Sequence, residues 1–207
     1  MLERIHSVLK KASRVAAWCG GGALMLAAIM VTIDVISRKL FAVTMSGSDE
    51  ITGYVFAAAI AWSFSYCLLH RANVRIDALY NHLGSKTRAW LDLLGLVLLL
   101  IFVSILAIKG VTVFTDSLEF NSTAMTTLAT PLWIPQLFWI SGVVFFFLTL
   151  SFLTLYTLVC ILRGDLKTVS RIAGVRSHEE EILEETHGTG VVVAGHQDSD
   201  GPEEGKS

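Results

Sequence analysis

Three ionisable side chains stand at the ends of long apolar segments, where a charge has few ways to be solvated. Asp34 and Arg38 are four residues apart with the acid first, the favourable order for an ion pair on one helix face. Glu50 opens the next apolar segment, where a carboxylate also suits the helix dipole. Because intramembrane charges usually face protein, we expect Asp34, Arg38 and Glu50 to form a polar cluster that fixes helix packing or engages a partner. Alternatively, Arg38 reaches the headgroups and Glu50 is only a first-turn acid.

A row of small residues follows Glu50 along the second apolar segment. Gly53, Ala57, Ala61 and Ser65 recur every four residues, which places them on one face of a helix. Helices in lipid associate by close packing, and small side chains let their backbones approach. We therefore expect Gly53, Ala57 and Ala61 to line a helix-packing or partner interface.

The sequence lacks the usual signatures of a reaction centre. All six histidines lie outside the apolar segments, so they cannot ligate a haem inside a membrane. There is no metal-ligand spacing, no glycine-rich phosphate loop and no nucleophile with a nearby base, and the three cysteines form no CxxC pair. We expect neither enzyme activity nor a cofactor or metal.

The elements that must position these residues are long apolar helices. Of the 207 residues, 53% are hydrophobic and only 16% are charged, whereas a soluble domain has about 25% charged residues. A helix needs roughly 20 residues to cross a hydrocarbon core of about 30 Å. The composition excludes a soluble enzyme and a nucleic-acid-binding protein. It predicts an all-α integral membrane protein with four transmembrane helices over about 18–36, 51–69, 90–108 and 134–162.

The basic residues alternate between the two ends of these spans. Lys and Arg number 4 before the first span, 2, 4 and 1 in the successive loops, and 4 just after the last span. Loops rich in Lys and Arg stay in the cytoplasm. The alternation therefore predicts that both termini and the central loop are cytoplasmic.

The segments that flank the spans have their own patterns. Residues 1–17 fit a basic amphipathic helix on the cytoplasmic membrane surface and, equally, a straight extension of the first span. A short interfacial helix is expected in the central loop, ending at Gly84, with Ser85 as the N-cap of the next helix. Residues 163–207 form a cytoplasmic tail that is acidic from about 178, which predicts disorder there.

Three separated motifs carry a family resemblance. Residues 34–41 read DVISRKLF and residues 47–51 read GSDEI, and His70, Arg75 and Asp77 follow the second span. This order resembles the small permease subunit of the tripartite ATP-independent periplasmic (TRAP) transporters, the DctQ-like family. That family shows an Arg and a Phe after its first helix, a Gly or Ser and a Glu opening the second, and then a His before a Val-x-Val/Ile-Asp stretch.

The resemblance implies a division of labour in a bacterial inner membrane. A periplasmic receptor captures an organic anion, a large permease subunit holds the substrate and sodium sites, and the small subunit is a scaffold beside it. The implied partners are the large permease, the receptor in transient contact, and membrane lipids, without nucleic acid. The residues agree with this role, because no predicted span has an ionisable group at its middle. The alternative is an independent four-span channel or regulator, but a channel would need a polar stripe along one span.

Overall fold

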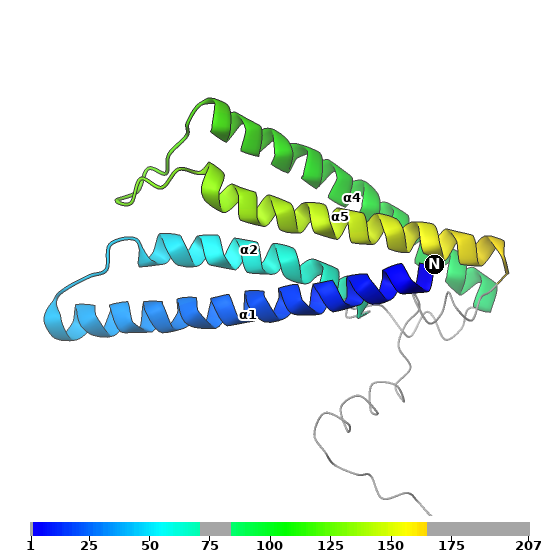
Figure 1. Cartoon of the computed structure of the whole chain (residues 1–207), viewed down its shortest axis with the longest axis horizontal. Coiled ribbons are helices and arrows are strands. Elements are labelled where there is room, and N and C mark those ends of the chain that lie inside the picture. Colours follow the sequence, from blue (N-terminus) through cyan, green and yellow to red (C-terminus); the bar gives the residue numbers. More distant parts are fainter. Residues whose placement is uncertain (1, 71–83, 165–207) are drawn as a thin grey trace, which may run out of the picture. The chain divides into compact units, whose positions relative to one another are not determined.

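The computed structural model describes residues 2–70 and 84–164. Within these residues the chain forms four α-helices, α1 (Leu2–Phe41), α2 (Ser48–Leu69), α4 (Ser85–Glu119) and α5 (Trp133–Leu162) (Figure 1). Each helix is long and apolar enough to cross a membrane, which confirms the predicted fold class. The expected interfacial helix of the central loop and the acidic tail lie outside the described residues.

The helices extend beyond the apolar spans that they contain. α1 continues without a break for 40 residues, so residues 2–17 extend the first span and do not form a separate helix. α4 passes through Lys109 and ends only at Glu119, which leaves a shorter loop before α5 than the sequence predicts. Charged residues such as Lys are good helix formers, so a charge that ends an apolar run does not end the helix.

The start of α4 differs from the prediction in one detail. Gly84, in an extended conformation, is the N-cap residue, and Ser85 is already the first residue of the helix. The N-cap position is therefore one residue earlier than the predicted Ser85. Glycine is tolerated at the N-cap because that position needs no helical dihedral angles.

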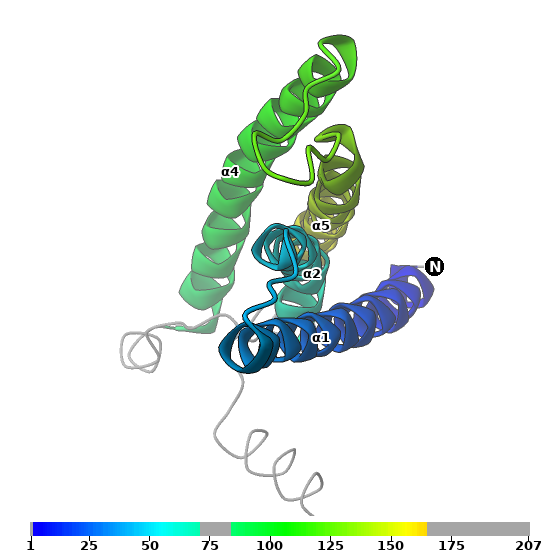
Figure 2. The same ribbon diagram turned by 90° about the vertical axis from the view of Figure 1, so that its left-hand side faces the viewer.

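The four helices lie side by side in the order α1, α2, α5 and α4 (Figures 1 and 2). α2 packs against both α1 and α5, whereas α4 packs mainly against α5. Consequently α1 and α4 each have one main neighbour, and they leave much of their apolar surface uncovered. Exposed apolar side chains along both helices, such as Leu26 and Phe102, are what a lipid environment requires.

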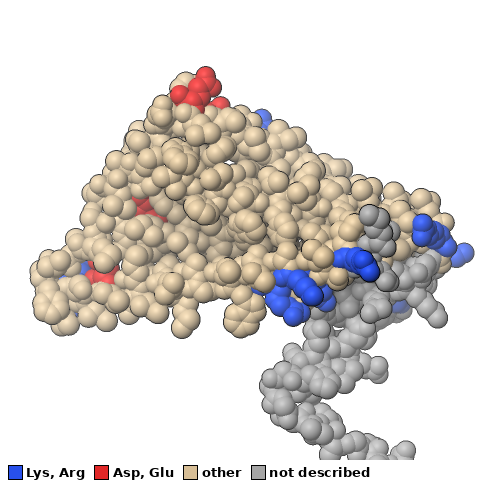
Figure 3. Space-filling view, viewed as in Figure 1, with Lys and Arg blue, Asp and Glu red and all other residues tan. Residues whose placement is uncertain are grey.

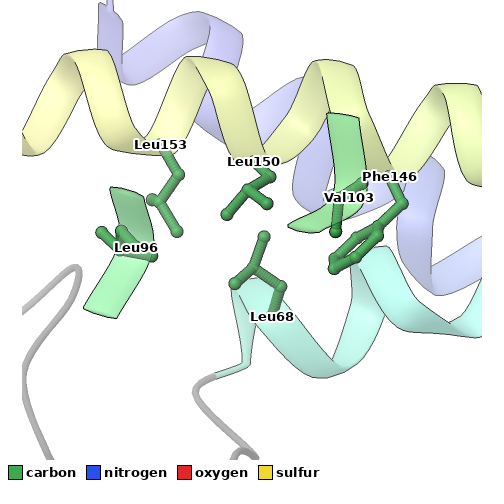
Figure 4. Close-up of a cluster of buried hydrophobic side chains, with 6 residues drawn as sticks. All are labelled: Leu68, Leu96, Val103, Phe146, Leu150 and Leu153. Carbon is green, nitrogen blue, oxygen red and sulfur yellow. The ribbon is translucent and has the colours of Figure 1, made fainter. Parts of the chain in front are cut away.

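Apolar clusters follow one another along α5, the most buried of the four helices. Near mid-height Ala61 of α2 meets Ile140 and Val143. The next cluster along α5 joins this helix to both α2 and α4. Beyond that cluster, Ala89 of α4 packs on Tyr156 of α5. The central cluster consists of Leu68, Leu96, Val103, Phe146, Leu150 and Leu153 (Figure 4).

The two ends of the bundle differ in charge. We call the end where α1 and α4 begin and α2 and α5 finish the basic end, and the end with the α1–α2 turn and the α4–α5 loop the loop end. Figure 3 shows Lys and Arg side chains over the first part of α1, and acidic side chains away from it. The basic end carries Arg4, Lys10, Lys11, Arg14, Lys86, Arg88 and Arg163 with Asp92, whereas the loop end carries Asp34, Asp49, Glu50, Asp116 and Glu119 with Arg38, Lys39 and Lys109.

Candidate functional site

A single buried carboxylate joins α1 to α2 at the loop end. Asp34 is only 2% exposed. Its Oδ1 accepts a hydrogen bond from the backbone N–H of Met45 at 2.5 Å. Its Oδ2 accepts hydrogen bonds from Arg38 Nη2 at 2.6 Å and from Ser48 Oγ at 3.1 Å. We call Asp34, Arg38, Met45 and Ser48 the polar lock, because one side chain of α1 binds both the turn and the first residue of α2.

The local backbone brings the donors of the polar lock to Asp34. Arg38 reaches the carboxylate because the two residues are one helical turn apart. α1 ends at Phe41, and the next residue, Ala42, has a left-handed φ of 54° that turns the chain back. Gly47, with a φ of 95°, is the N-cap residue of α2, and glycine adopts this conformation without steric cost. The turn is short enough to place Ser48 opposite Asp34.

Glu50 is not part of the polar lock, which corrects the expected three-residue cluster. Its Oε1 accepts a hydrogen bond from Tyr54 Oη at 2.7 Å, one turn along α2. Glu50 and Arg38 are both described, and no ion pair joins them. The guanidinium of Arg38 is occupied by Asp34, the nearer carboxylate on its own helix. Thr126 and Thr130 of the α4–α5 loop lie beside Glu50 instead.

The α4–α5 loop forms a narrow hairpin that reaches the α1–α2 turn. Its two arms are joined by a hydrogen bond from Ala124 N–H to the Thr130 carbonyl oxygen at 2.9 Å. At the hairpin, Ser46 Oγ donates to Thr127 Oγ1 at 2.6 Å, and Leu128 lies where a side chain at Gly47 would be. The sequence gives no sign of this contact, because its partners are 81 residues apart.

The predicted row of small residues on α2 divides into two parts. Ala61 is 4% exposed and lies against Gly142 of α5, where an added Cβ would come within 2.9 Å of the Ala61 carbonyl carbon. Ser65 is buried as well. Nearer the loop end, Gly53 and Ala57 are exposed, and no atom lies within 4 Å of a Cβ built on Gly53. The row therefore packs against α5 at Ala61 and is exposed at Gly53 and Ala57.

The contact of α2 with α1 uses a residue outside the predicted row. A Cβ on Gly20 of α1 would come within 3.3 Å of the Ala59 Cα. Ala59 is two positions from Ala61 and so faces another side of the helix. α2 needs two close-packing faces because it has two helical neighbours.

The third motif is described only at its first residue. His70 is the C-cap of α2, and its ring stacks on Tyr66 with a centroid distance of 3.9 Å. Its Nδ1 lies 3.0 Å from the Tyr66 carbonyl oxygen. Arg75 and Asp77 lie outside the described residues.

Between the two ends, the buried polar side chains of the described helices carry hydroxyl groups. Thr149 and Thr154 donate to the carbonyl oxygens four residues earlier in α5, so the helix itself satisfies them. The buried carboxylates, Asp34 and Asp92, belong to opposite ends of the bundle. Among the residues described, no group of His, Cys, Asp or Glu is arranged to hold a metal ion.

Comparison with known proteins identifies a family of transporter components. Residues 13–163 match the model of the family described as tripartite ATP-independent periplasmic transporters, DctQ component. No curated protein and no solved structure matches the chain. Components of this family work with a large permease and a binding protein, and four apolar helices fit a multi-pass inner-membrane protein. The match covers most of the sequence, so the chain belongs to the DctQ family, the small permease component of TRAP transporters.

Proposed function

We propose that this chain is the scaffold subunit of its transporter. It holds the large permease in the inner membrane while that subunit moves an organic anion, which a periplasmic receptor delivers and an ion gradient drives across. The observation that supports this role is the separation of Asp34 and Asp92 at opposite ends, with hydroxyl groups between them. Sites for an anion and a coupling ion need convergent charged or polar groups near mid-membrane, and the large permease supplies them.

We place the contact with the large permease on the open part of α2. Gly53 and Ala57 are exposed, and the chain's own helices do not use their small size. Phe56 and Ile60 are exposed beside them and would provide apolar contact. Small residues allow the backbone of a neighbouring helix to approach closely, which is the main source of helix association in lipid.

We propose that the basic end faces the cytoplasm and the loop end the periplasm. The distribution of Lys and Arg supports this orientation. Single cysteines at Thr44 and Thr123, in a variant without native cysteines, should react from the periplasm with a membrane-impermeant thiol reagent. A cysteine at Ser85 should react only after the membrane is opened. Labelling at position 85 in intact cells would reverse the proposed orientation.

Reconstitution tests the scaffold role directly. Proteoliposomes with this chain alone should take up no substrate. Addition of the large permease and the loaded receptor should produce uptake that depends on an ion gradient, and sodium and proton gradients are imposed separately to identify the coupling ion. Uptake by this chain alone would contradict the proposal.

Bulky substitution tests the proposed interface. Ala57→Phe should weaken the affinity for the large permease by roughly one to two orders of magnitude, because overpacking costs about 1–3 kcal/mol. Recovery of the complex should fall accordingly. Ile60→Leu conserves volume and is the matched control. Wild-type recovery and transport with Ala57→Phe would show that this part of α2 faces lipid.

A further inference from the structure

An apolar groove lies along one side of the bundle and is lined by residues of α1, α2 and α5. Its volume is about 1000 Å³. α1 lines it largely with small residues, among them Ala12, Ala16 and Ala23, and this leaves the space between the helices unfilled. Ala58 of α2 and Phe138 of α5 complete the apolar lining. Gly53 and Ala57, the proposed contact with the large permease, do not line this groove.

The groove has a positively charged mouth at the basic end. Lys11 lines it directly. Arg4 lies on the same face of α1, because the two positions are seven residues apart, which is nearly two helical turns. Within the described part of the chain, neither cation pairs with a carboxylate. The mouth therefore suits an anion, whereas the body of the groove suits a hydrocarbon chain.

The length of the groove fits one leaflet of a bilayer. From Lys11 to Ala23, a helix rises about 18 Å at about 1.5 Å per residue. One leaflet contributes about 15 Å, half of the hydrocarbon core. If the headgroup of a lipid lies at Lys11, one of its acyl chains would thus extend along the α1 side of the groove.

We propose that this groove binds an anionic phospholipid. Lys11 and Arg4 hold the phosphate, and an acyl chain lies along α1 from Ala12 to Ala23. Basic pockets between transmembrane helices are suited to anionic headgroups. This site adds to the proposed scaffold function, and it does not depend on the identity of the transported anion.

The charge of the mouth favours lipid over a helix of another protein. A helix would have to bring its own carboxylate to neutralise Lys11, at the cost of a charged group near hydrocarbon. A phospholipid carries its negative charge at the headgroup depth and leaves only methylene groups in the groove. Lys10 and Arg14 belong to the same turns of α1 but do not line the groove, so they provide matched controls.

Lipid retention by the purified full chain tests the site. The chain in detergent is incubated with dioleoylphosphatidylglycerol or dioleoylphosphatidylcholine, and bound lipid is counted by native mass spectrometry. We expect one phosphatidylglycerol to be retained in preference to phosphatidylcholine. Lys11→Gln should lower its retention about fivefold, and Arg4→Gln together with Lys11→Gln about 25-fold. Lys11→Arg, Lys10→Gln and Arg14→Gln should all retain it at the wild-type level.

A second measurement uses a native side chain as reporter. Cys19 is exposed and lines the groove. Bound phosphatidylglycerol should slow its modification by an apolar maleimide, read by peptide mass, and Lys11→Gln should restore the faster rate. Ala16→Leu fills part of the groove and should lower lipid retention without any change of charge.

Four results would overturn the proposal. The first is a loss of lipid with Lys10→Gln as large as that with Lys11→Gln, which would indicate diffuse attraction. The second is equal retention of phosphatidylglycerol and phosphatidylcholine. The third is loss of the large permease with Ala16→Leu at unchanged lipid retention, which would assign the groove to a helix of that partner. The fourth is conversion of a dimer of this chain to a monomer by the same variant, which would assign the groove to a second copy.

Discussion

The loop end and the middle of the bundle hold the same helices together by different means. At the loop end, Asp34 accepts hydrogen bonds from Arg38, Met45 and Ser48, and so connects α1 to α2 through charge and polarity. At mid-height, α2 packs closely against α1 at Gly20 and against α5 at Gly142, because these glycines have no side chain. One region specifies partners by chemistry, and the other specifies them by shape.

The difference follows from where each region lies in a membrane. A carboxylate is tolerable near the end of a span, where water and headgroups are close, and its directional bonds fix which residue stands opposite. In the hydrocarbon interior a charge is costly, and lipid provides no hydrophobic drive between helices, so close approach must supply the packing energy. Changes at the loop end should therefore act through unsatisfied polar groups, and changes at mid-height through volume.

The largest effect is expected at Asp34. Asp34→Ala leaves the buried Ser48 hydroxyl and the Met45 N–H without their acceptor, and each unsatisfied group costs about 1–3 kcal/mol. The free energy of unfolding should fall by about 3 kcal/mol, measured by thermal or denaturant unfolding of the purified chain in detergent. Arg38→Gln is the control, because the side chain of Arg38 is 56% exposed and water can replace its hydrogen bond to Asp34, so the loss should be smaller. If Arg38→Gln lowered the free energy of unfolding as much as Asp34→Ala, the ion pair would be the main contribution of the polar lock.

The same substitution should have opposite effects at two glycines. Gly142→Ala places a Cβ 2.9 Å from the backbone of α2, so the helices must separate at a cost of about 1–3 kcal/mol. Gly53→Ala meets no atom within 4 Å and should leave unfolding unchanged or stabilise the helix by about 0.5–1 kcal/mol. Unfolding measurements on the two variants side by side decide the matter. Equal stability would mean that shape does not select the α2–α5 contact.

A smaller loss is expected at Gly47. Gly47→Ala must hold alanine at a φ of 95° and place its methyl group against Leu128, and we expect a loss of about 1–2 kcal/mol in the free energy of unfolding. Leu128→Ala introduced together with Gly47→Ala should recover the steric part of the loss and leave the backbone part. A double variant no more stable than Gly47→Ala alone would show that Leu128 does not restrict this turn.

The smallest effect is expected at Trp62. Its indole Nε1–H donates to the Phe138 carbonyl oxygen at 3.0 Å, and its ring stacks on Phe145 at a centroid distance of 5.6 Å. Trp62→Phe keeps an aromatic ring and removes the donor. The loss should be about 0.6 kcal/mol, the usual value for a hydrogen bond between membrane helices. Trp62→Ala, which also removes the stacking, should cost clearly more, and equal losses would assign the contribution to the hydrogen bond alone.

Local patterns in the sequence account for the elements and for one contact. Four charge-poor segments of sufficient length predict the four helices, because length and polarity alone decide whether a helix can cross a membrane. The placement of Arg38 beside Asp34 also follows from spacing, because residues four apart always meet on a helix. The spacing of small residues on α2 indicates close packing, but periodicity cannot tell which part of the row meets a neighbour.

The remaining contacts depend on the tertiary arrangement. Met45 and Ser48 reach Asp34 only because the turn folds back, and Thr127 meets Ser46 across 81 residues. The division of the α2 row into a packed Ala61 and an open Ala57 depends on where α5 crosses it. The groove beside Lys11 exists only between three helices. The sequence by itself determined which segments become helices and which side chains share a face, whereas the packing of one helix on another decided which faces are closed, because that choice depends on the summed shape of residues far apart in the chain.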